Sequence, residues 1–125
     1  MKVLLISVDA ALRKNLPLMM CGDALELVLA GDAQEAAGLA RQLRFDAAIV
    51  DLYAPGRAGL RVLRDACAGL PGIPLVALAM RVYAEYRTAC QAAGADFFMD
   101  KSGDLRDLAQ VVRLMALENA GTGAQ

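Results

Sequence analysis

The strongest constraint on the fold is a short apolar run that ends in a carboxylate. Residues 47–50 read Ala-Ala-Ile-Val without polar alternation, and Asp51 follows directly. Such a run is typical of a strand covered on both faces, as in a parallel sheet. Pro55 and Gly56 then predict a turn. Open parallel sheets bind ligands at the carboxyl ends of their strands, which makes Asp51 a candidate site residue. The alternative is that it only ends the strand and is solvated.

Strand-like and helix-like patterns alternate along the rest of the chain. Besides the run at 47–50, apolar strands are expected at residues 2–8, 25–30, 74–80 and 96–100. Between them, apolar residues recur with the spacing of a helix face, as at Ala36, Leu39, Ala40 and Leu43. Strands that alternate with helices through short connections predict one α/β domain, with a parallel sheet and helices on both faces. We expect this domain to occupy residues 1–120 and residues 121–125 to form a flexible tail.

Capping residues mark where several helices begin and end. Asp9 stands directly before an Ala-Ala-Leu segment and is a good N-cap, and Asp32 with Glu35 forms a pair similar to a capping box. Gly94 is suited to end the helix expected at 81–93. These signals fix the approximate helix boundaries.

Composition excludes several classes of protein. Hydrophobic residues make up 58% of the 125 residues and charged residues 22%, which indicates a folded chain. The formal net charge of −1 gives no electrostatic footprint for nucleic acid. No apolar run approaches the roughly 20 residues that a membrane span needs, and the first residues turn acidic too soon for a secretory signal. We expect neither nucleic acid nor membrane as a direct partner.

The cysteine and histidine contents narrow the chemistry. Cys21, Cys67 and Cys90 are widely spaced and odd in number, which suits free thiols in a reducing compartment, so we expect a cytoplasmic protein. The chain has no histidine. That excludes Ser-His and Cys-His nucleophile pairs and zinc sites that contain histidine. For the same reason, the chain cannot itself donate a phosphoryl group from histidine.

Over residues 2–118 the sequence resembles the receiver domains of bacterial two-component response regulators. The resemblance rests on Asp51, Pro55, Gly56 and Gly59, on Ile73 and Pro74 at the fourth strand, on Gly94, Ala95 and Asp96, and on Lys101 after the fifth strand. Each is weak alone, but together they are specific. The resemblance implies a flavodoxin-like (βα)5 fold, a doubly wound parallel sheet with strand order 2-1-3-4-5.

The resemblance also implies a chemistry and partners. A sensor histidine kinase or a phosphotransfer protein would give its phosphoryl group to Asp51, the phosphoacceptor position. Lys101 would pair with that carboxylate and then with the phosphoryl oxygens, and Mg²⁺ would neutralise the developing charge. An output protein would bind the face formed by the fourth helix, fifth strand and fifth helix. The candidate contacts on this face are Tyr83, Tyr86, Arg87 and Arg106. The alternative is that these are ordinary solvent-exposed helix residues.

The positions that usually bind the metal depart from the family pattern. Ser7 and Val8 stand where an acidic pair is expected, and neither supplies a carboxylate. Asp9 would join Asp51 as a ligand only if the first strand bulged by one residue; otherwise it is the helix N-cap. The sequence therefore predicts weak or absent Mg²⁺ binding.

The switch positions also differ from the pattern. Ala79 replaces the hydroxyl residue that usually ends the fourth strand, and Phe98 occupies the aromatic switch position, where it also suits the core. Ser102 replaces the proline that usually follows the lysine, and it is a candidate cap for the last helix. We expect a trans bond before Ser102, since a cis bond to a non-proline residue costs about 2.5–4 kcal/mol.

The expected protein is therefore a receiver, not an enzyme, that acts chiefly through protein contacts. One alternative is a fully competent receiver that uses Asp9 for Mg²⁺. Another, from a different class, is a small flavin- or nucleotide-binding protein on the same sheet. The segment after the first strand lacks the glycine- or serine-rich anion loop that such a protein needs. A third alternative is that these residues are a fragment of a longer regulator.

Overall fold

Strands and helices alternate along the chain as the apolar pattern predicts. The structure is a computed structural model that describes residues 1–20, 25–52, 57–80, 84–101, 103 and 105–123, with 119–123 described as backbone only. The elements in chain order are β1 Lys2–Ile6, α1 Ala10–Met20, β2 Glu26–Ala30, α2 Ala33–Gln42, β3 Ala47–Leu52, α3 Arg57–Gly69, β4 Leu75–Ala79, α4 Ala84–Ala93, β5 Phe97–Asp100, the 3-10 helix η1 Leu105–Asp107, and α5 Leu108–Gly123.

β3 lies at the centre of a five-stranded parallel sheet. The strand order is β2-β1-β3-β4-β5, which confirms the predicted doubly wound topology. Every residue of β3 is buried, as expected for an apolar run between two strands with helices above and below. β3 extends to Leu52, one residue beyond Asp51, so Asp51 is part of the ladder and lies beside Leu78 of β4. This register places Asp51 at the carboxyl edge of the sheet.

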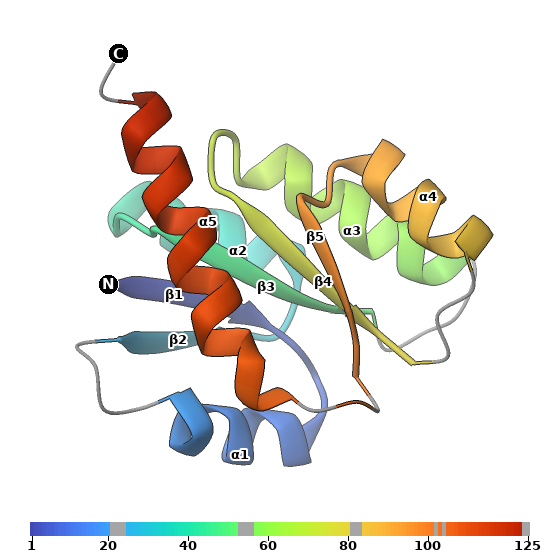
Figure 1. Ribbon diagram of the computed structural model, residues 1–125, viewed down its shortest axis with the longest axis horizontal. Helices are drawn as coiled ribbons and strands as arrows, with labels where there is room; N and C mark the ends of the chain where they lie inside the picture. The colour runs from blue at the N-terminus through green and yellow to red at the C-terminus, as the bar shows by residue number, and fades with distance from the viewer. Residues whose placement is uncertain (21–24, 53–56, 81–83, 102, 104, 124–125) are drawn as a thin grey trace.

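Helices cover both faces of the sheet and form two apolar layers (Figure 1). α1 and α5 cover one face, where Leu16 and Val112 belong to the same buried cluster. α2, α3 and α4 cover the other face, with Leu63 and Cys90 in the second cluster. In Figure 1, α5 crosses in front of the sheet and α3 lies behind it. Because both faces are covered, the central strands carry apolar residues at almost every position.

Helix ends agree with several predicted caps. Asp32 accepts a hydrogen bond from the Glu35 N–H at 2.7 Å and caps α2 as predicted. The last helix begins later than predicted, because the 3-10 turn Leu105–Asp107 precedes α5. α5 then continues to Gly123, into the segment expected as a tail. Ser102, the predicted cap, lies outside the described residues.

Two predictions from composition can be compared with the structure: that the cysteines are free, and that no segment spans a membrane. Cys90 is buried, Cys67 is half-buried, and both are free. Burial raises the pKa of each thiol, which keeps it in the less reactive neutral form. Cys21 lies outside the described residues. In the part of the chain that the structure describes, no helix has both the length and the apolar composition to cross a bilayer.

Gly94 joins α4 to β5 in a conformation and at a distance that suit only glycine. Its φ is 121°, a value that residues with side chains rarely adopt. A Cβ at this position would lie 2.6 Å from Cys67 Sγ on α3. Gly94 therefore ends α4, as predicted, and also lets α3 pack closely against the connection.

Gly94→Ala should lower the free energy of unfolding by about 2 kcal/mol, because strain at positive φ and the close contact with Cys67 add together. Gly72→Ala is the matched control. Gly72 also has a positive φ, 77°, but a Cβ there would meet no atom within 4 Å. We expect this control to cost about 1 kcal/mol. Urea unfolding measures both values, and equal losses would show that the contact with Cys67 contributes nothing.

Candidate functional site

Asp51 is a fully buried carboxylate at the carboxyl edge of the sheet. Its side chain is 0% exposed. Oδ2 accepts a hydrogen bond from Ser7 Oγ at 2.7 Å and lies 3.0 Å from Lys101 Nζ. Oδ1 is buried and has no hydrogen-bond partner among the described residues. Since a buried carboxylate without partners is costly, these two neighbours offset the cost of burying Asp51.

Lys101 reaches Asp51 because β5 ends beside β4. The Lys101 backbone N–H donates to Ala79 O at 2.8 Å, which extends the ladder by one residue. β4 separates β5 from β3, and the long lysine side chain spans that distance. The contact predicted from the sequence is present. The chemical roles of Asp51 and Lys101 remain predictions.

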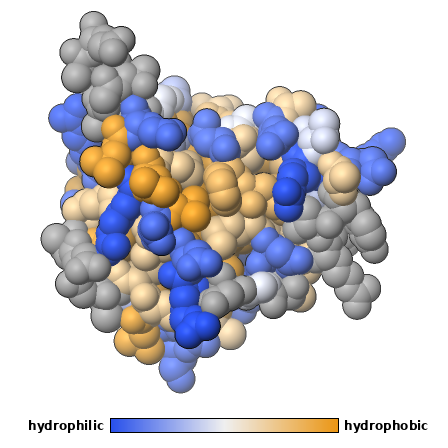
Figure 2. Space-filling view, in the orientation of Figure 1, coloured by the Kyte–Doolittle hydropathy of each residue, from blue (hydrophilic) through white to orange (hydrophobic). Residues whose placement is uncertain are grey.

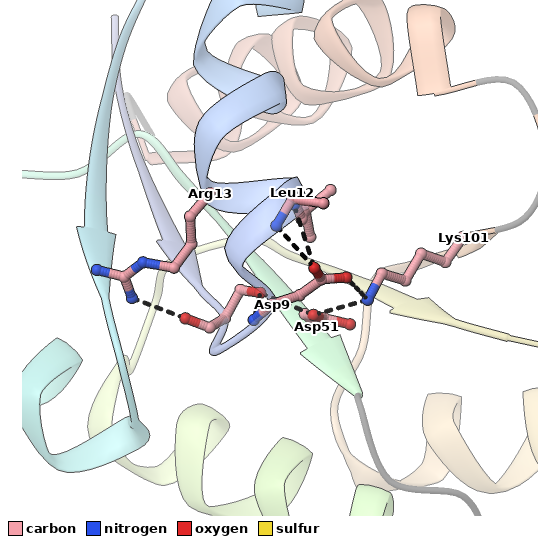
Figure 3. A network of polar contacts seen from close by, with 7 residues as sticks. Asp9, Leu12, Arg13, Asp51 and Lys101 are labelled. Carbon is pink, nitrogen blue, oxygen red and sulfur yellow. Dashed lines mark hydrogen bonds and ion pairs between the residues drawn. The ribbon is translucent and has the colours of Figure 1, made fainter.

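Asp9 binds the same ammonium group (Figure 3). Its Oδ2 lies 2.6 Å from Lys101 Nζ. Its Oδ1 accepts hydrogen bonds from the backbone N–H groups of Ala11 and Leu12, at 3.0 and 3.3 Å. The predicted N-cap is therefore confirmed. β1 pairs in unbroken register over its whole length, so Asp9 reaches the site as the residue before α1 and not through a bulge.

Ser7 ties the two carboxylate residues together. Its hydroxyl donates to Asp51 Oδ2 and accepts a hydrogen bond from the Asp9 N–H at 3.1 Å. Arg13 Nη1 donates to the Ser7 carbonyl at 2.8 Å and so fixes the same segment from α1. The sequence predicted Ser7 only as the replacement of an acid, and this donor role was missed. The available signal was a polar residue directly after a buried strand.

A family match decides what kind of site this is. Residues 3–113 match the family model of the response regulator receiver domain. The chain belongs to this family. It is 29% identical over 115 residues to the probable transcriptional regulatory protein TcrX of Mycobacterium tuberculosis, a match that covers 92% of this chain and 48% of that protein. The chain spans about half the length of the curated relatives it matches.

Solved structures share the fold of this receiver. The receiver domain of the Francisella response regulator 1452 has a TM-score of 0.80 at 19% identity, covering 94% of this chain and 97% of that one. The receiver domain of the sensor histidine kinase PA1611 from Pseudomonas aeruginosa has a TM-score of 0.74 at 20% identity, covering 92% and 96%. That structure holds a magnesium ion in its active-site cleft. The predicted flavodoxin-like fold is confirmed.

In this receiver, the contacts between Lys101 and the carboxylates shift the pKa values of Asp9 and of Lys101 itself. The hydrogen bond from Lys101 lowers the pKa of Asp9 below its ordinary 3.8, and the Leu12 N–H acts in the same direction. Burial alone would lower the pKa of Lys101. Hydrogen bonds to Asp9 and Asp51 outweigh burial and raise that pKa above its ordinary 10.5. The charged forms of Asp9 and Lys101 therefore stabilise the fold at neutral pH.

The pH dependence of stability follows from these directions. A carboxyl group with a lowered folded pKa contributes stability above its unfolded pKa, near 3.8, and loses it as the pH falls through the folded value. We expect the receiver to be more stable than its Asp9→Asn variant at neutral pH, by at most about 1 kcal/mol, because 33% of the Asp9 side chain is exposed. The difference should vanish well below pH 3.8.

Urea unfolding at several pH values checks this expectation. Asparagine is as good an N-cap as aspartate, so the substitution keeps the hydrogen bonds to α1 and removes the charge. A difference in stability that stays constant with pH would assign the effect to capping and not to the ion pair. On the alkaline side, the contribution of Lys101 should be lost only as the pH rises through its raised pKa.

Magnesium, which the PA1611 receiver holds in its active-site cleft, does not fit the residues described here. The resemblance in sequence places the acidic pair of the family at Ser7 and Val8. The Ser7 hydroxyl is donated to Asp51, and Val8 is exposed and has no ligand atom. The ammonium of Lys101 already pairs with both Asp51 and Asp9. Within the described chain, no three acidic, cysteine or histidine side chains are placed to hold a metal. Weak Mg²⁺ binding remains a prediction.

The two switch positions lie in one apolar cluster. Ala79 at the end of β4 and Phe98 on β5 are both buried in the layer covered by α2, α3 and α4. Phe98 meets Tyr86 edge-on, with ring centroids 6.3 Å apart, and the Arg87 guanidinium lies 5.8 Å from the Phe98 centroid. Ala79 has no hydroxyl to offer the site. Other residues named from the sequence that lie outside the described residues are Pro55, Gly56, Tyr83 and Ser102.

Proposed function

We propose that this receiver is a phosphorelay signalling module in which Asp51 is the phosphoacceptor and Lys101 is its cationic partner. The observation that carries the proposal is the 3.0 Å contact between Lys101 Nζ and the buried Asp51 carboxylate at the edge of β3. Phosphoryl transfer to a carboxylate needs an oxygen nucleophile and a fixed positive charge for the phosphoryl oxygens. These two side chains supply both.

In the proposed reaction, an Asp51 carboxylate oxygen bonds to the phosphorus of a phosphohistidine. The phosphorus–nitrogen bond breaks, and the histidine nitrogen leaves with the electron pair. Lys101 then pairs with the phosphoryl oxygens instead of the carboxylate. Because Ala79 has no hydroxyl to bind the phosphoryl group, we infer that phosphorylation of Asp51 is weakly coupled to the position of Phe98.

The proposed donor is a sensor histidine kinase or a phosphotransfer protein, since this chain contains no histidine. The proposed output partner is a protein that binds the surface of α4, β5 and α5. Phe97 on β5 and Leu114 and Leu117 on α5 are large exposed hydrophobic residues, which supports a protein contact there. Figure 2 shows hydrophobic side chains gathered over α5.

The polar residues of this surface agree with a contact role. Arg87 and Arg106 are exposed, and Tyr86 is half-buried. The net charge of −1 supports a role without direct nucleic-acid binding. We therefore propose a cytoplasmic signalling protein over residues 1–120, without enzymatic turnover of its own, that acts chiefly through protein contacts.

A second candidate is a fully Mg²⁺-dependent receiver in which Asp9 replaces the missing acidic pair. The observation that favours it is that Asp9 and Asp51 bind the same ammonium, so their carboxylates already face one point. A metal between them would require Lys101 to leave.

Intact-mass analysis after incubation with acetyl phosphate tests both candidates. We expect slow formation of one phosphoryl adduct, absent from Asp51→Asn and little changed by Mg²⁺. Asp46→Asn is the control, since Asp46 lies before β3 at its other end and binds the Lys2 N–H. It should be labelled like the unmodified protein. A stable adduct on Asp51→Asn would place the phosphoacceptor elsewhere, and strong acceleration by Mg²⁺ would favour the second candidate.

A further inference from the structure

The arrangement of the site closes Asp51 to solvent. Its side chain is 0% exposed. Ser7 and Lys101 bind Oδ2, and Oδ1 is buried without a hydrogen-bond partner in the described chain. A phosphodonor can therefore reach a carboxylate oxygen only after one of the neighbouring side chains has moved.

Asp51 has negatively charged side chains and a positively charged side chain in its surroundings. On one side is a cavity of about 110 Å³ whose lining includes Asp32 and Asp65. These additional carboxylates disfavour the approach of an anionic phosphodonor. Lys101 and Asp9 are not among the residues that line this cavity. The ammonium of Lys101 attracts anions, but Asp9 already binds it at 2.6 Å. The favourable side for a donor is thus the one that the ion pair closes.

Asp9 is the firmly held member of that ion pair (Figure 3). Its Oδ1 is fixed by the N–H groups of Ala11 and Leu12, and its own N–H is bound to Ser7 Oγ. Lys101, in contrast, has a long and flexible side chain. Its contact with Asp9, at 2.6 Å, is shorter than its contact with Asp51, at 3.0 Å. The fixed carboxylate of Asp9 therefore helps to set the position of the ammonium.

We propose that Asp9 is a positioning residue that clamps Lys101 and thereby restrains phosphorylation of Asp51. The proposal rests on the phosphoacceptor function proposed above. The Asp9 carboxylate occupies the side of the ammonium that phosphoryl oxygens would otherwise bind. Two carboxylates and one ammonium leave the site with a net negative charge. An incoming phosphoryl group, with about two negative charges of its own, must displace Asp9 and then lie beside it.

Labelling with acetyl phosphate tests the clamp. In this reaction an Asp51 oxygen bonds to phosphorus, the bond from phosphorus to the acetyl oxygen breaks, and acetate leaves with the electron pair. Asp9→Asn keeps the N-cap and removes the charge that holds Lys101. Asp32→Asn is the matched control. Asp32 also caps a helix and borders the cavity beside Asp51, but its side chain binds the Glu35 N–H.

We expect Asp9→Asn to form the adduct roughly tenfold faster than the unmodified protein, with and without millimolar Mg²⁺. Asp32→Asn should stay within about twofold of the unmodified rate, because it leaves the ion pair between Asp9 and Lys101 intact. Asp9→Ser, another good cap that is too short to reach Lys101, should behave like Asp9→Asn. NMR of the lysine ammonium groups tests the clamp without phosphorylation. The Lys101 ammonium signal should change in Asp9→Asn and not in Asp32→Asn.

Several results would overturn the clamp and leave the phosphoacceptor function standing. One is that Asp9→Asn is phosphorylated no faster than the unmodified protein, and another is that Asp32→Asn is accelerated as much as Asp9→Asn. A third is that the Lys101 ammonium signal is unchanged in Asp9→Asn. The fourth is that Mg²⁺ accelerates phosphorylation of the unmodified protein and that this acceleration is lost in Asp9→Asn. The last of these would make Asp9 a metal ligand. Labelling that persists in Asp51→Asn, or that fails in every variant, would overturn the phosphoacceptor function and the clamp with it.

Discussion

Lys101→Met is expected to lower the free energy of unfolding by about 3 kcal/mol. Methionine keeps an unbranched apolar side chain but removes the ammonium. Among the described residues, Asp51, which is 0% exposed, then keeps only the hydrogen bond from Ser7. Breaking a buried pair by removing one partner is strongly destabilising, because the remaining charge is neither hydrated nor paired. Asp9 contributes less to this loss, since part of its side chain faces solvent.

Asp51→Asn is the matched test of that explanation. It removes the buried charge, keeps the shape of the side chain and leaves Lys101 paired with Asp9. We expect it to change stability by less than about 1 kcal/mol, and we expect Lys101→Met to cost only about 1 kcal/mol in the Asp51→Asn background. Urea unfolding of the four proteins gives the coupling energy. A cost of Lys101→Met that is the same in both backgrounds would contradict the role of the buried charge.

The fold was predictable because its signals are local and repeated. The apolar run at 47–50 indicates a doubly covered strand without tertiary information, and β3 is buried throughout. Boundaries were less accurate, because side-chain contacts decide them. β1 was predicted to reach Val8 but ends at Ile6. The Ser7 hydroxyl binds the Asp51 carboxylate across the sheet edge, and Asp9 already caps α1.

The site was predictable only in part. Asp51 and Lys101 both follow apolar runs that predict strands, so the carboxyl-edge rule places them together. Lys101 Nζ lies 3.0 Å from Asp51 Oδ2. The distance from Asp9 to Lys101 depends on the angle at which α1 leaves β1 and on a lysine rotamer. No periodic pattern encodes either of these. The sequence offered two roles for Asp9, N-cap or metal ligand, and its ion pair with Lys101 emerged only from the structure.

Substitution of Ser7 and Val8 together by Asp is expected to create Mg²⁺ binding, whereas we expect none from the unmodified protein at millimolar concentration. Mg²⁺ gives up its water reluctantly and needs carboxylate ligands to replace it. At present Asp51 and Asp9 share the ammonium of Lys101, so little charge is left to attract a dication. The double substitution adds two carboxylates at the positions where the resemblance places the acidic pair of the family. Calorimetric titration should then show binding in the millimolar range or tighter.

The same double substitution should lower stability by about 2–3 kcal/mol when Mg²⁺ is absent, because it adds like charge to a partly closed site. The position of Ser7 is 2% exposed, so its new carboxylate would lie beside Asp51 without solvent. Val8→Asp alone is the control: Val8 is 55% exposed, and we expect a change within about 0.5 kcal/mol and no binding. Mg²⁺ should restore the stability of the double variant by mass action. Tight Mg²⁺ binding by the unmodified protein would show instead that Asp9 acts as a ligand, and that this receiver is an ordinary metal-dependent phosphoacceptor.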